Sequence, residues 1–291
     1  MSEAARGHLA MLAFSALVAG SFALGALAAN LLAPAALNAV RFALAALVIA
    51  GLGLATGAFR RSDLAAPWRY AVLGGLFSTY FVLMFEGLKT APAVSAAAVF
   101  TLTPVLAAGF GWLLLRQITT AWMALALAIG ATGALWVIFR ADLSAALAFE
   151  IGRGEIIYFW GCVAHAIYTP MVARLNRGES PLAFTFGMLV AGTVILGLAG
   201  APTLAATDWA ALPQIVWITI AYTAFAASAA TFVLLQYATM RLPSAKVMAY
   251  TYLTPSWVIL WQIALAGDTP APLTLIGVAL TATALLMLLR Q

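Results

Sequence analysis

Residues 92–104 read PAVSAAAVFTLTP, and residues 243–255 read PSAKVMAYTYLTP. Each stretch lies inside a long apolar run, begins with a proline and ends on Leu-Thr-Pro. The spacing between the first proline and the Leu-Thr-Pro is the same in both. This match indicates an internal repeat, so we expect a chain built from two halves of similar fold.

The composition around these stretches indicates a membrane protein. Of the 291 residues, 65% are hydrophobic and only 8% are charged, and the mean hydropathy is +1.05. A soluble domain carries about 25% charged residues, so this chain has too few charges to cover a surface that faces water. The apolar runs are long and unbroken, unlike the alternating segments of a transmembrane barrel. We therefore expect an all-α polytopic membrane protein.

Ten spans are predicted, because a helix needs about 20 apolar residues to cross roughly 30 Å of hydrocarbon. The predicted spans are residues 7–29, 34–56, 68–87, 92–115, 121–139, 155–175, 180–200, 213–237, 243–266 and 271–289. We interpret the first run as a span rather than a cleaved signal peptide, because the repeat requires it. Five spans per half, in residues 1–145 and 146–291, make the halves inverted repeats. Such repeats are typical of secondary transporters, which bind substrate near the midplane between the halves.

The distribution of basic residues predicts the orientation, because lysine and arginine collect in cytoplasmic loops. One side carries Arg6, Arg60, Arg61, Arg69, Arg116, Arg174, Arg177, Arg241 and Arg290. The other side carries Lys89, Arg140 and Arg153. We therefore expect both termini in the cytoplasm.

Three motifs, taken in order and with their spacing, resemble the drug/metabolite transporter superfamily, specifically its EamA-type exporters with ten helices. They are Asn38-Ala39-Val40-Arg41-Phe42, the stretch from Pro92 to Pro104 and the stretch from Pro243 to Pro255. Within the superfamily the chain looks most like the YddG-type aromatic amino acid exporters. One departure concerns the Gly-Glu that many members carry at the ends of the fourth and ninth helices. This chain has Leu115-Arg116-Gln117 and Gly267-Asp268 there, so no role is carried over for that acidic position.

The resemblance implies a secondary transporter of the bacterial inner membrane that exports aromatic or hydrophobic amino acids and related metabolites by alternating access. We expect a small-molecule substrate, a monomer in the lipid bilayer, no cofactor, no metal and no nucleic-acid partner. No Asp is embedded in a span, which favours uncoupled export. Proton-coupled efflux of other small metabolites or drugs is the alternative. An intramembrane enzyme is the rival from another class, and the absence of HExxH, GxSxG and paired Asp residues argues against it.

Aromatic and polar side chains recur at helical spacing in several spans, a pattern that suits the wall of a cavity better than a surface that faces lipid. The eighth span has Tyr222, Phe225, Phe232 and Gln236 on one face, and the ninth has Lys246, Tyr250, Trp257 and Trp261. Packing between helices is the alternative interpretation of each stripe. The predicted substrate-binding residues are Tyr80, Phe81, Met84, Phe100, Trp160, His165, Tyr168, Phe232, Lys246, Tyr250 and Trp257. An aromatic lining suits a flat ligand with a charged end, because rings stack for about 0.5 to 1.5 kcal/mol beyond burial.

Charged groups inside the spans are informative because each costs about 2.5 to 3.5 kcal/mol at the middle of the membrane. We expect Arg41 to be a structural charge that pairs with Glu86 or reaches the interface. Lys246 has two open interpretations. It either extends to the cytoplasmic interface or provides a cation for a substrate carboxylate.

Two prolines lie in the middle of matching spans. Pro104 and Pro255 each lack the backbone donor that a helix interior uses, so each is expected to kink its helix. A matched pair favours hinges that take part in gating. A static kink, satisfied by the hydroxyl of Thr103 or Thr254, is the alternative.

Overall fold

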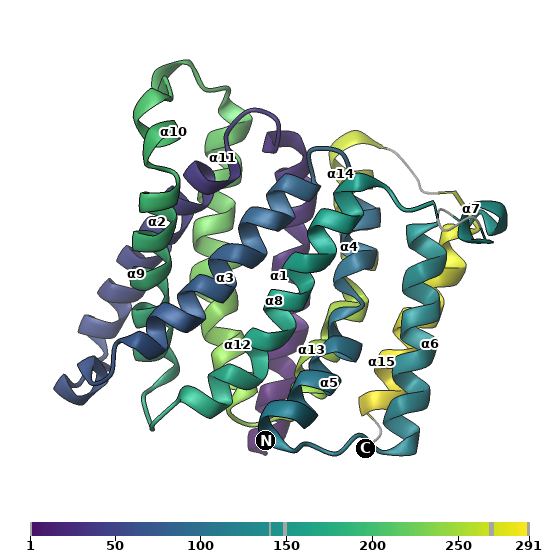
Figure 1. The fold of residues 1–291 in the computed structure, drawn as a ribbon, viewed down its shortest axis with the longest axis horizontal. Helices are drawn as coiled ribbons and strands as arrows, with labels where there is room; N and C mark the ends of the chain where they lie inside the picture. The colour runs from purple at the N-terminus through teal and green to yellow at the C-terminus, as the bar shows by residue number, and fades with distance from the viewer. Residues whose placement is uncertain (1, 140, 148–149, 268–270, 290–291) are drawn as a thin grey trace.

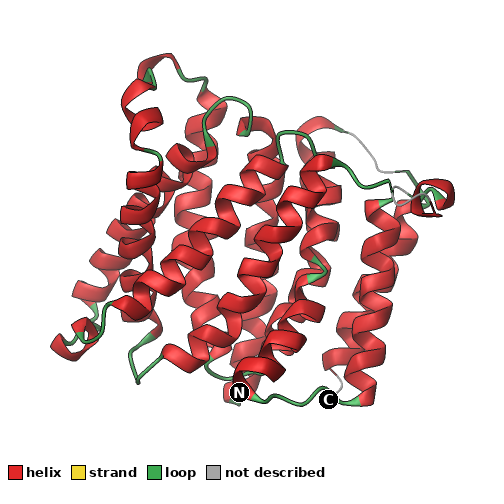
Figure 2. Ribbon diagram, in the orientation of Figure 1, coloured by secondary structure: helices red, strands yellow, loops and turns green. Residues whose placement is uncertain are grey.

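The computed structural model describes residues 2–139, 141–147, 150–267 and 271–289, and this part of the chain forms helices and loops without strands (Figure 2). The α-helices are α1 (Glu3–Ala28), α2 (Pro34–Ala55), α3 (Trp68–Gly87), α4 (Ala93–Phe100), α5 (Thr103–Leu115), α6 (Ala121–Ile138), α7 (Leu143–Leu147), α8 (Arg153–Leu175), α9 (Pro181–Ala199), α10 (Ala201–Ala206), α11 (Gln214–Ala224), α12 (Thr231–Thr239), α13 (Ser244–Ala249), α14 (Thr254–Ala266) and α15 (Thr274–Leu289). Short 3-10 turns cover Arg61–Leu64, Trp209–Ala211 and Tyr250–Leu253.

Eight described helices are long and apolar enough to cross a membrane. They correspond to the first eight predicted spans, so the prediction of an all-helical membrane protein is confirmed. The ninth predicted span is divided into α13, a 3-10 turn and α14. The tenth corresponds to α15, which has 16 residues, fewer than the roughly 20 of a regular span. The count of ten therefore stays a prediction.

The helices stand roughly side by side, with α1 and α8 near the middle of the bundle (Figure 1). Helix α1 packs against α11, α12 and α14, and α8 packs against α3, α4 and α5. At the flanks, α2 packs against α9 and α6 packs against α15. Helix α1 begins and α15 ends at the same end of the bundle (Figure 1). We call this the arginine-rich end, because α3 begins and α8 ends there with Arg69 and Arg174.

Both Leu-Thr-Pro motifs coincide with an interruption of a helix. Helix α4 ends at Phe100 and α5 begins at Thr103, with Pro104 in its first turn. In the second half, a 3-10 turn separates α13 from α14, which begins at Thr254 and has Pro255 in its first turn. A proline fits the first turn of a helix, where its missing N–H would have no partner in any case. The interrupted helices pack against each other, α13 against α5 and α14 against α4.

A π-helix, Phe225–Ala230, joins α11 to α12. Its wider turns shift the phase of the helix. The stripe predicted for this span is therefore wrong at Phe225, which is 50% exposed, whereas Phe232 and Gln236 are buried. The small side chains of the segment gave no periodic signal from which the shift could be predicted.

Candidate functional site

Aromatic side chains from four helices pack together in the interior of the bundle. We call them the aromatic cluster: Phe77, Tyr80 and Phe81 of α3, Phe100 of α4, His165 and Tyr168 of α8, and Phe232 of α12. All are buried. Helical spacing produces the set, because residues three and four apart on α3, and three apart on α8, share one face.

The rings of the cluster are in direct contact. His165 stacks on Phe100, with ring centroids 5.3 Å apart and planes 7° from parallel. The Phe77 ring lies 4.0 Å from that of Tyr168 and 4.6 Å from that of Phe232. Phe77 therefore connects α3 to both α8 and α12. It was not among the predicted binding residues, although its spacing from Tyr80 and Phe81 placed it on their face.

Two polar side chains at the cluster keep unused hydrogen-bonding capacity. Within the described part of the chain, neither ring nitrogen of His165 has a partner, although the residue is only 1% exposed. Gln236 donates its amide N–H to the Tyr168 hydroxyl at 2.9 Å, while its amide oxygen is unpartnered among the described residues. An unsatisfied buried polar group costs about 1–3 kcal/mol. Such groups are points at which water or a ligand would be stabilised.

Arg41 adjoins the cluster and is completely buried. Its guanidinium carbon lies 3.7 Å from the centroid of the Phe81 ring. Its Nε donates to the Ser228 hydroxyl at 2.6 Å, and Nη2 donates to the carbonyl of Ala227 at 2.7 Å. Both acceptors belong to the π-helix.

The predicted partnership of Arg41 with Glu86 is wrong. Glu86 instead forms an ion pair with Lys89 at 2.7 Å, one helical turn further along the chain. Arg41 does not reach the interface either, because none of it is exposed. The π-helix offers acceptors near Phe81, and these bind Arg41 away from the end of α3.

The stripe predicted for the ninth span faces α1 rather than the aromatic cluster. The Tyr250 hydroxyl lies 3.1 Å from Nδ1 of His8, and the Trp257 ring N–H donates to the Ser15 hydroxyl at 3.2 Å. Lys246 is partly exposed at the start of this stripe.

Two further predicted binding residues, Met84 and Trp160, are not members of the aromatic cluster. Met84 is fully buried within the same core as the aromatic cluster. Trp160 is 60% exposed and contacts the ring of Phe159, its neighbour in sequence, so the structure places it outside the cluster.

One buried acid, Glu155, was not among the residues predicted from the sequence. Glu155, in the first turn of α8, is 4% exposed and accepts a hydrogen bond of 2.7 Å from the Ser95 hydroxyl of α4. It stands at the edge of its predicted span, where a carboxylate is expected to reach water. Packing of α4 against the start of α8 covers it instead.

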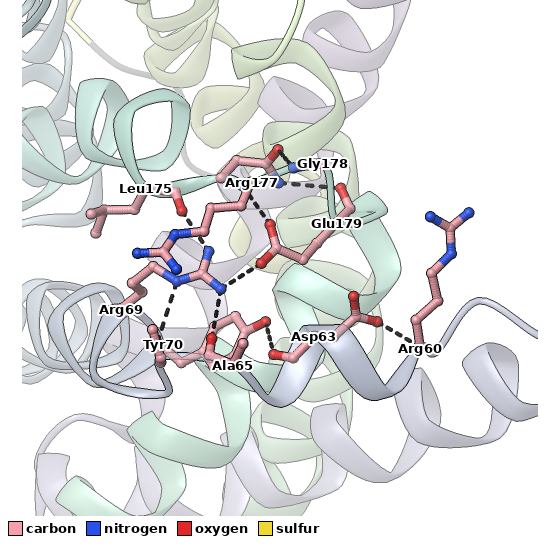
Figure 3. Close-up of polar contacts among 11 residues, drawn as sticks. Arg60, Asp63, Ala65, Arg69, Tyr70, Leu175, Arg177, Gly178 and Glu179 are labelled. Carbon is pink, nitrogen blue, oxygen red and sulfur yellow. Dashed lines mark hydrogen bonds and ion pairs between the residues drawn. The ribbon is translucent and has the colours of Figure 1, made fainter.

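A second polar site lies at the arginine-rich end, where α3 meets the loop between α8 and α9 (Figure 3). Arg69 is 1% exposed and pairs with the Glu179 carboxylate at 2.5 Å. It also donates to the carbonyls of Leu175, at 2.6 Å, and Ala65, at 2.9 Å. This network joins residues of the first half to residues of the second.

The charge of Glu179 is maintained by these contacts. Burial raises the pKa of its carboxyl, but the hydrogen bonds from Arg69 and from the backbone N–H of Arg177 outweigh burial and hold the pKa below its ordinary value. The pair is therefore ionised at neutral pH. A buried pair of this kind fixes geometry, because breaking it leaves an uncompensated charge.

The rings of the aromatic cluster pack directly against one another. One cavity is a groove of about 590 Å³ at the arginine-rich end, lined mainly by apolar side chains that include Phe59, Tyr70 and Phe186. In the described part of the chain, no three His, Cys, Asp or Glu side chains gather as metal ligands.

Comparison with known proteins supports a transporter. Residues 5–139 and residues 152–290 each match the model of the EamA-like transporter family. An uncharacterized transporter of Bacillus subtilis (strain 168), YyaM, is 27% identical over 266 residues, which cover 90% of this chain and 86% of that protein. A solved crystal structure shares the fold with a TM-score of 0.74 at 21% sequence identity, covering 98% of this chain and 96% of the other.

Proposed function

Because the chain belongs to the EamA-like transporter family, we propose that it exports aromatic or hydrophobic amino acids and related metabolites by alternating access. The observation that carries this proposal is the aromatic cluster, in which both ring nitrogens of His165 and the amide oxygen of Gln236 have no partner among the described residues. Rings favour a flat apolar group through offset and edge-to-face contacts. The unsatisfied polar atoms favour a ligand that also brings donors and acceptors.

The proposed architecture has ten spans in two inverted repeats, residues 1–145 and 146–291. The interrupted helix α13–α14 serves as the ninth span and α15 as the tenth. Three observations support the repeat: the family model matches twice, a Leu-Thr-Pro interruption occurs in each half, and the packing is reciprocal. Helix α1 packs on α11, α12 and α14 of the second half, as α8 packs on α3, α4 and α5 of the first.

The proposed transport cycle separates the rings of the aromatic cluster by rocking one half against the other. Pro104 and Pro255 act as the hinges, because each stands in the first turn after an interruption. The arginine-rich end faces the cytoplasm of a bacterial inner membrane. In this orientation, the ion pair between Arg69 and Glu179 links the two halves on the cytoplasmic side.

Export is proposed to be uncoupled, as facilitated diffusion. One observation favours a second candidate, proton-coupled efflux. Glu155 is a buried carboxylate that accepts a hydrogen bond from a neutral hydroxyl, that of Ser95, and forms no ion pair with a described residue. An intramembrane acid is the usual carrier of a transported proton.

Counterflow of labelled phenylalanine in proteoliposomes, with and without a pH gradient, tests both candidates. Saturable flux that ignores the gradient supports uncoupled export, and flux driven by the gradient supports the second candidate. His165→Phe keeps a ring but removes the two unpartnered nitrogens, so we expect phenylalanine flux to fall about tenfold, which corresponds to one lost hydrogen bond. Trp160→Phe, on an exposed face, is the matched control and should leave flux unchanged. No saturable flux of any amino acid in folded protein would reject the proposed substrate class.

A further inference from the structure

We propose that Arg41 binds the carboxylate of the transported substrate. This inference rests on the proposed function and adds to it the group that recognises the charged end of the ligand. The sequence favours a structural role for Arg41, but the structure surrounds its charge with neutral groups alone, which a purely structural charge does not require.

The first observation is an imbalance of charge. Arg41 is 0% exposed, yet none of the ion pairs among the described residues includes it. A buried cation ordinarily has an anionic partner, because removing it from water is costly. The neighbours of Arg41 are neutral: the Ser228 hydroxyl, the Ala227 carbonyl and the Phe81 ring. No described residue supplies the anion that would complete this site, and we assign that part to the substrate.

The second observation is the number of donors that remain. A guanidinium has five N–H groups. One is used by Ser228 and one by Ala227, and a third makes a long contact of 3.4 Å from Nη1 to the side-chain oxygen of Asn38. Each terminal nitrogen keeps an N–H for which the described residues offer no partner. A carboxylate that accepts from both would form the bidentate contact for which arginine is suited.

The third observation is the position of Arg41 relative to the rings. Its guanidinium lies on Phe81, which itself contacts Phe77, Tyr80 and Phe232 of the aromatic cluster. A ligand whose ring lies in the cluster therefore has its carboxylate close to the guanidinium of Arg41. The unpartnered amide oxygen of Gln236 adds an acceptor near Tyr168, suited to the ammonium group of an amino acid.

The π-helix explains how the guanidinium is kept in place. A π-helical turn disturbs the regular i→i−4 hydrogen bonding and leaves backbone carbonyls available. In this chain the Ala227 carbonyl points to Arg41, and the Ser228 hydroxyl adds a second acceptor. These two contacts orient the guanidinium and leave its charge uncompensated.

Lys246, the other cation considered for this role, is less suited to it. It is partly exposed and lies on the face that carries Tyr250, which contacts His8 of α1. It therefore serves as the matched control.

The test compares phenylalanine with phenylalaninamide, which keeps the ring and the amine but lacks the carboxylate. Each competes for counterflow of labelled phenylalanine in proteoliposomes that hold the wild-type protein, Arg41→Gln, Arg41→Lys or Lys246→Met. We expect the wild type to prefer phenylalanine by about 10- to 100-fold, the value of one charge-assisted hydrogen bond. Arg41→Gln should lose that preference, whereas Lys246→Met should keep it. Arg41→Lys keeps the charge but not the bidentate contact, so it should bind phenylalanine about tenfold more weakly and still prefer it to the amide.

The outcomes separate the inference from the proposed function. An Arg41→Gln protein that transports phenylalanine with the wild-type preference would overturn the inference and leave the proposed function intact. If that variant does not fold, as judged by size-exclusion profile, Arg41→Lys decides, and an unchanged affinity for phenylalanine in it would overturn the inference. A folded wild-type protein that shows no saturable flux of phenylalanine or of any other amino acid would reject the proposed function, and the inference with it.

Discussion

Two adjacent glycines of α3 differ sharply in what surrounds them. A Cβ built on Gly74 would lie 2.7 Å from the backbone nitrogen of Gly192 and 2.8 Å from the carbonyl oxygen of Met188, both on α9. A Cβ on Gly75 would meet only the end of the Ile195 side chain, at 3.8 Å, which is ordinary contact. Backbone atoms cannot rotate away as a side chain can, so alanine at the first position requires α3 and α9 to move apart.

The expected size of this effect follows from two opposing contributions. Alanine gains about 1 kcal/mol over glycine in a helix interior, and both variants share that gain. Gly74→Ala also carries the cost of overpacking, typically about 1–3 kcal/mol. We therefore expect Gly74→Ala to be less stable than Gly75→Ala by about 1–3 kcal/mol, with Gly75→Ala equal to the wild type or slightly more stable.

Reversible unfolding of the purified protein in mixed micelles, followed by circular dichroism, measures this difference. Because the two variants have the same composition and lie on the same helix, changes in expression or in detergent binding should affect them equally. Phe77 lies one turn from Gly74, so we also expect phenylalanine flux to fall in Gly74→Ala and not in Gly75→Ala. Equal unfolding free energies for the two variants would show that the approach of α3 to α9 is not as close as described.

Other predictions concern the arginine-rich end, the hinges and the buried acid. Glu179→Gln leaves Arg69 buried without its partner and should lower the unfolding free energy by about 3 kcal/mol. Folding lowers the pKa of Glu179, so the stability that this carboxylate contributes is present above its ordinary pKa near 4.5 and is lost as the pH falls through the folded pKa. Between pH 7 and pH 3 the unfolding free energy should therefore fall more steeply in the wild type than in Glu179→Gln, and parallel curves would contradict this. Pro104→Ala and Pro255→Ala should each reduce phenylalanine flux about tenfold in proteoliposomes while binding persists, and wild-type flux in both would remove the hinge role. Glu155→Gln should transport at the wild-type rate without a pH gradient, and a loss of gradient-driven flux in this variant alone would favour the proton-coupled alternative.

Much of the fold follows from local signals in the sequence. Long apolar runs predicted the membrane-length helices, and Pro104 and Pro255 stand where the helices are interrupted. Helical spacing also brought together the residues that share a face on α3 and on α8. These properties depend on the nearest neighbours along the chain, so they are visible without a structure.

The partners across the bundle were harder to predict. A stripe shows that one side of a helix faces another helix, but it does not say which one. The stripe of Tyr250 and Trp257 therefore proved to face α1. The acceptors of Arg41 lie on a π-helix, 186 and 187 positions further along the chain. One of them is a backbone carbonyl, which every residue has, so the residue types in this segment do not predict the contact.

The pairing of Arg69 with Glu179 has a consequence for how the protein is made. The two residues are 110 positions apart, and chains emerge from the ribosome with the N-terminal part first. While the first half is inserted, the guanidinium of Arg69 lacks the Glu179 carboxylate and the Leu175 carbonyl that it binds in the folded protein. The start of α3 therefore becomes buried only after the loop that carries Glu179 has been synthesised. Burial of the start of α3 is therefore a late step of assembly, and it would not take place in a chain that is truncated before that loop.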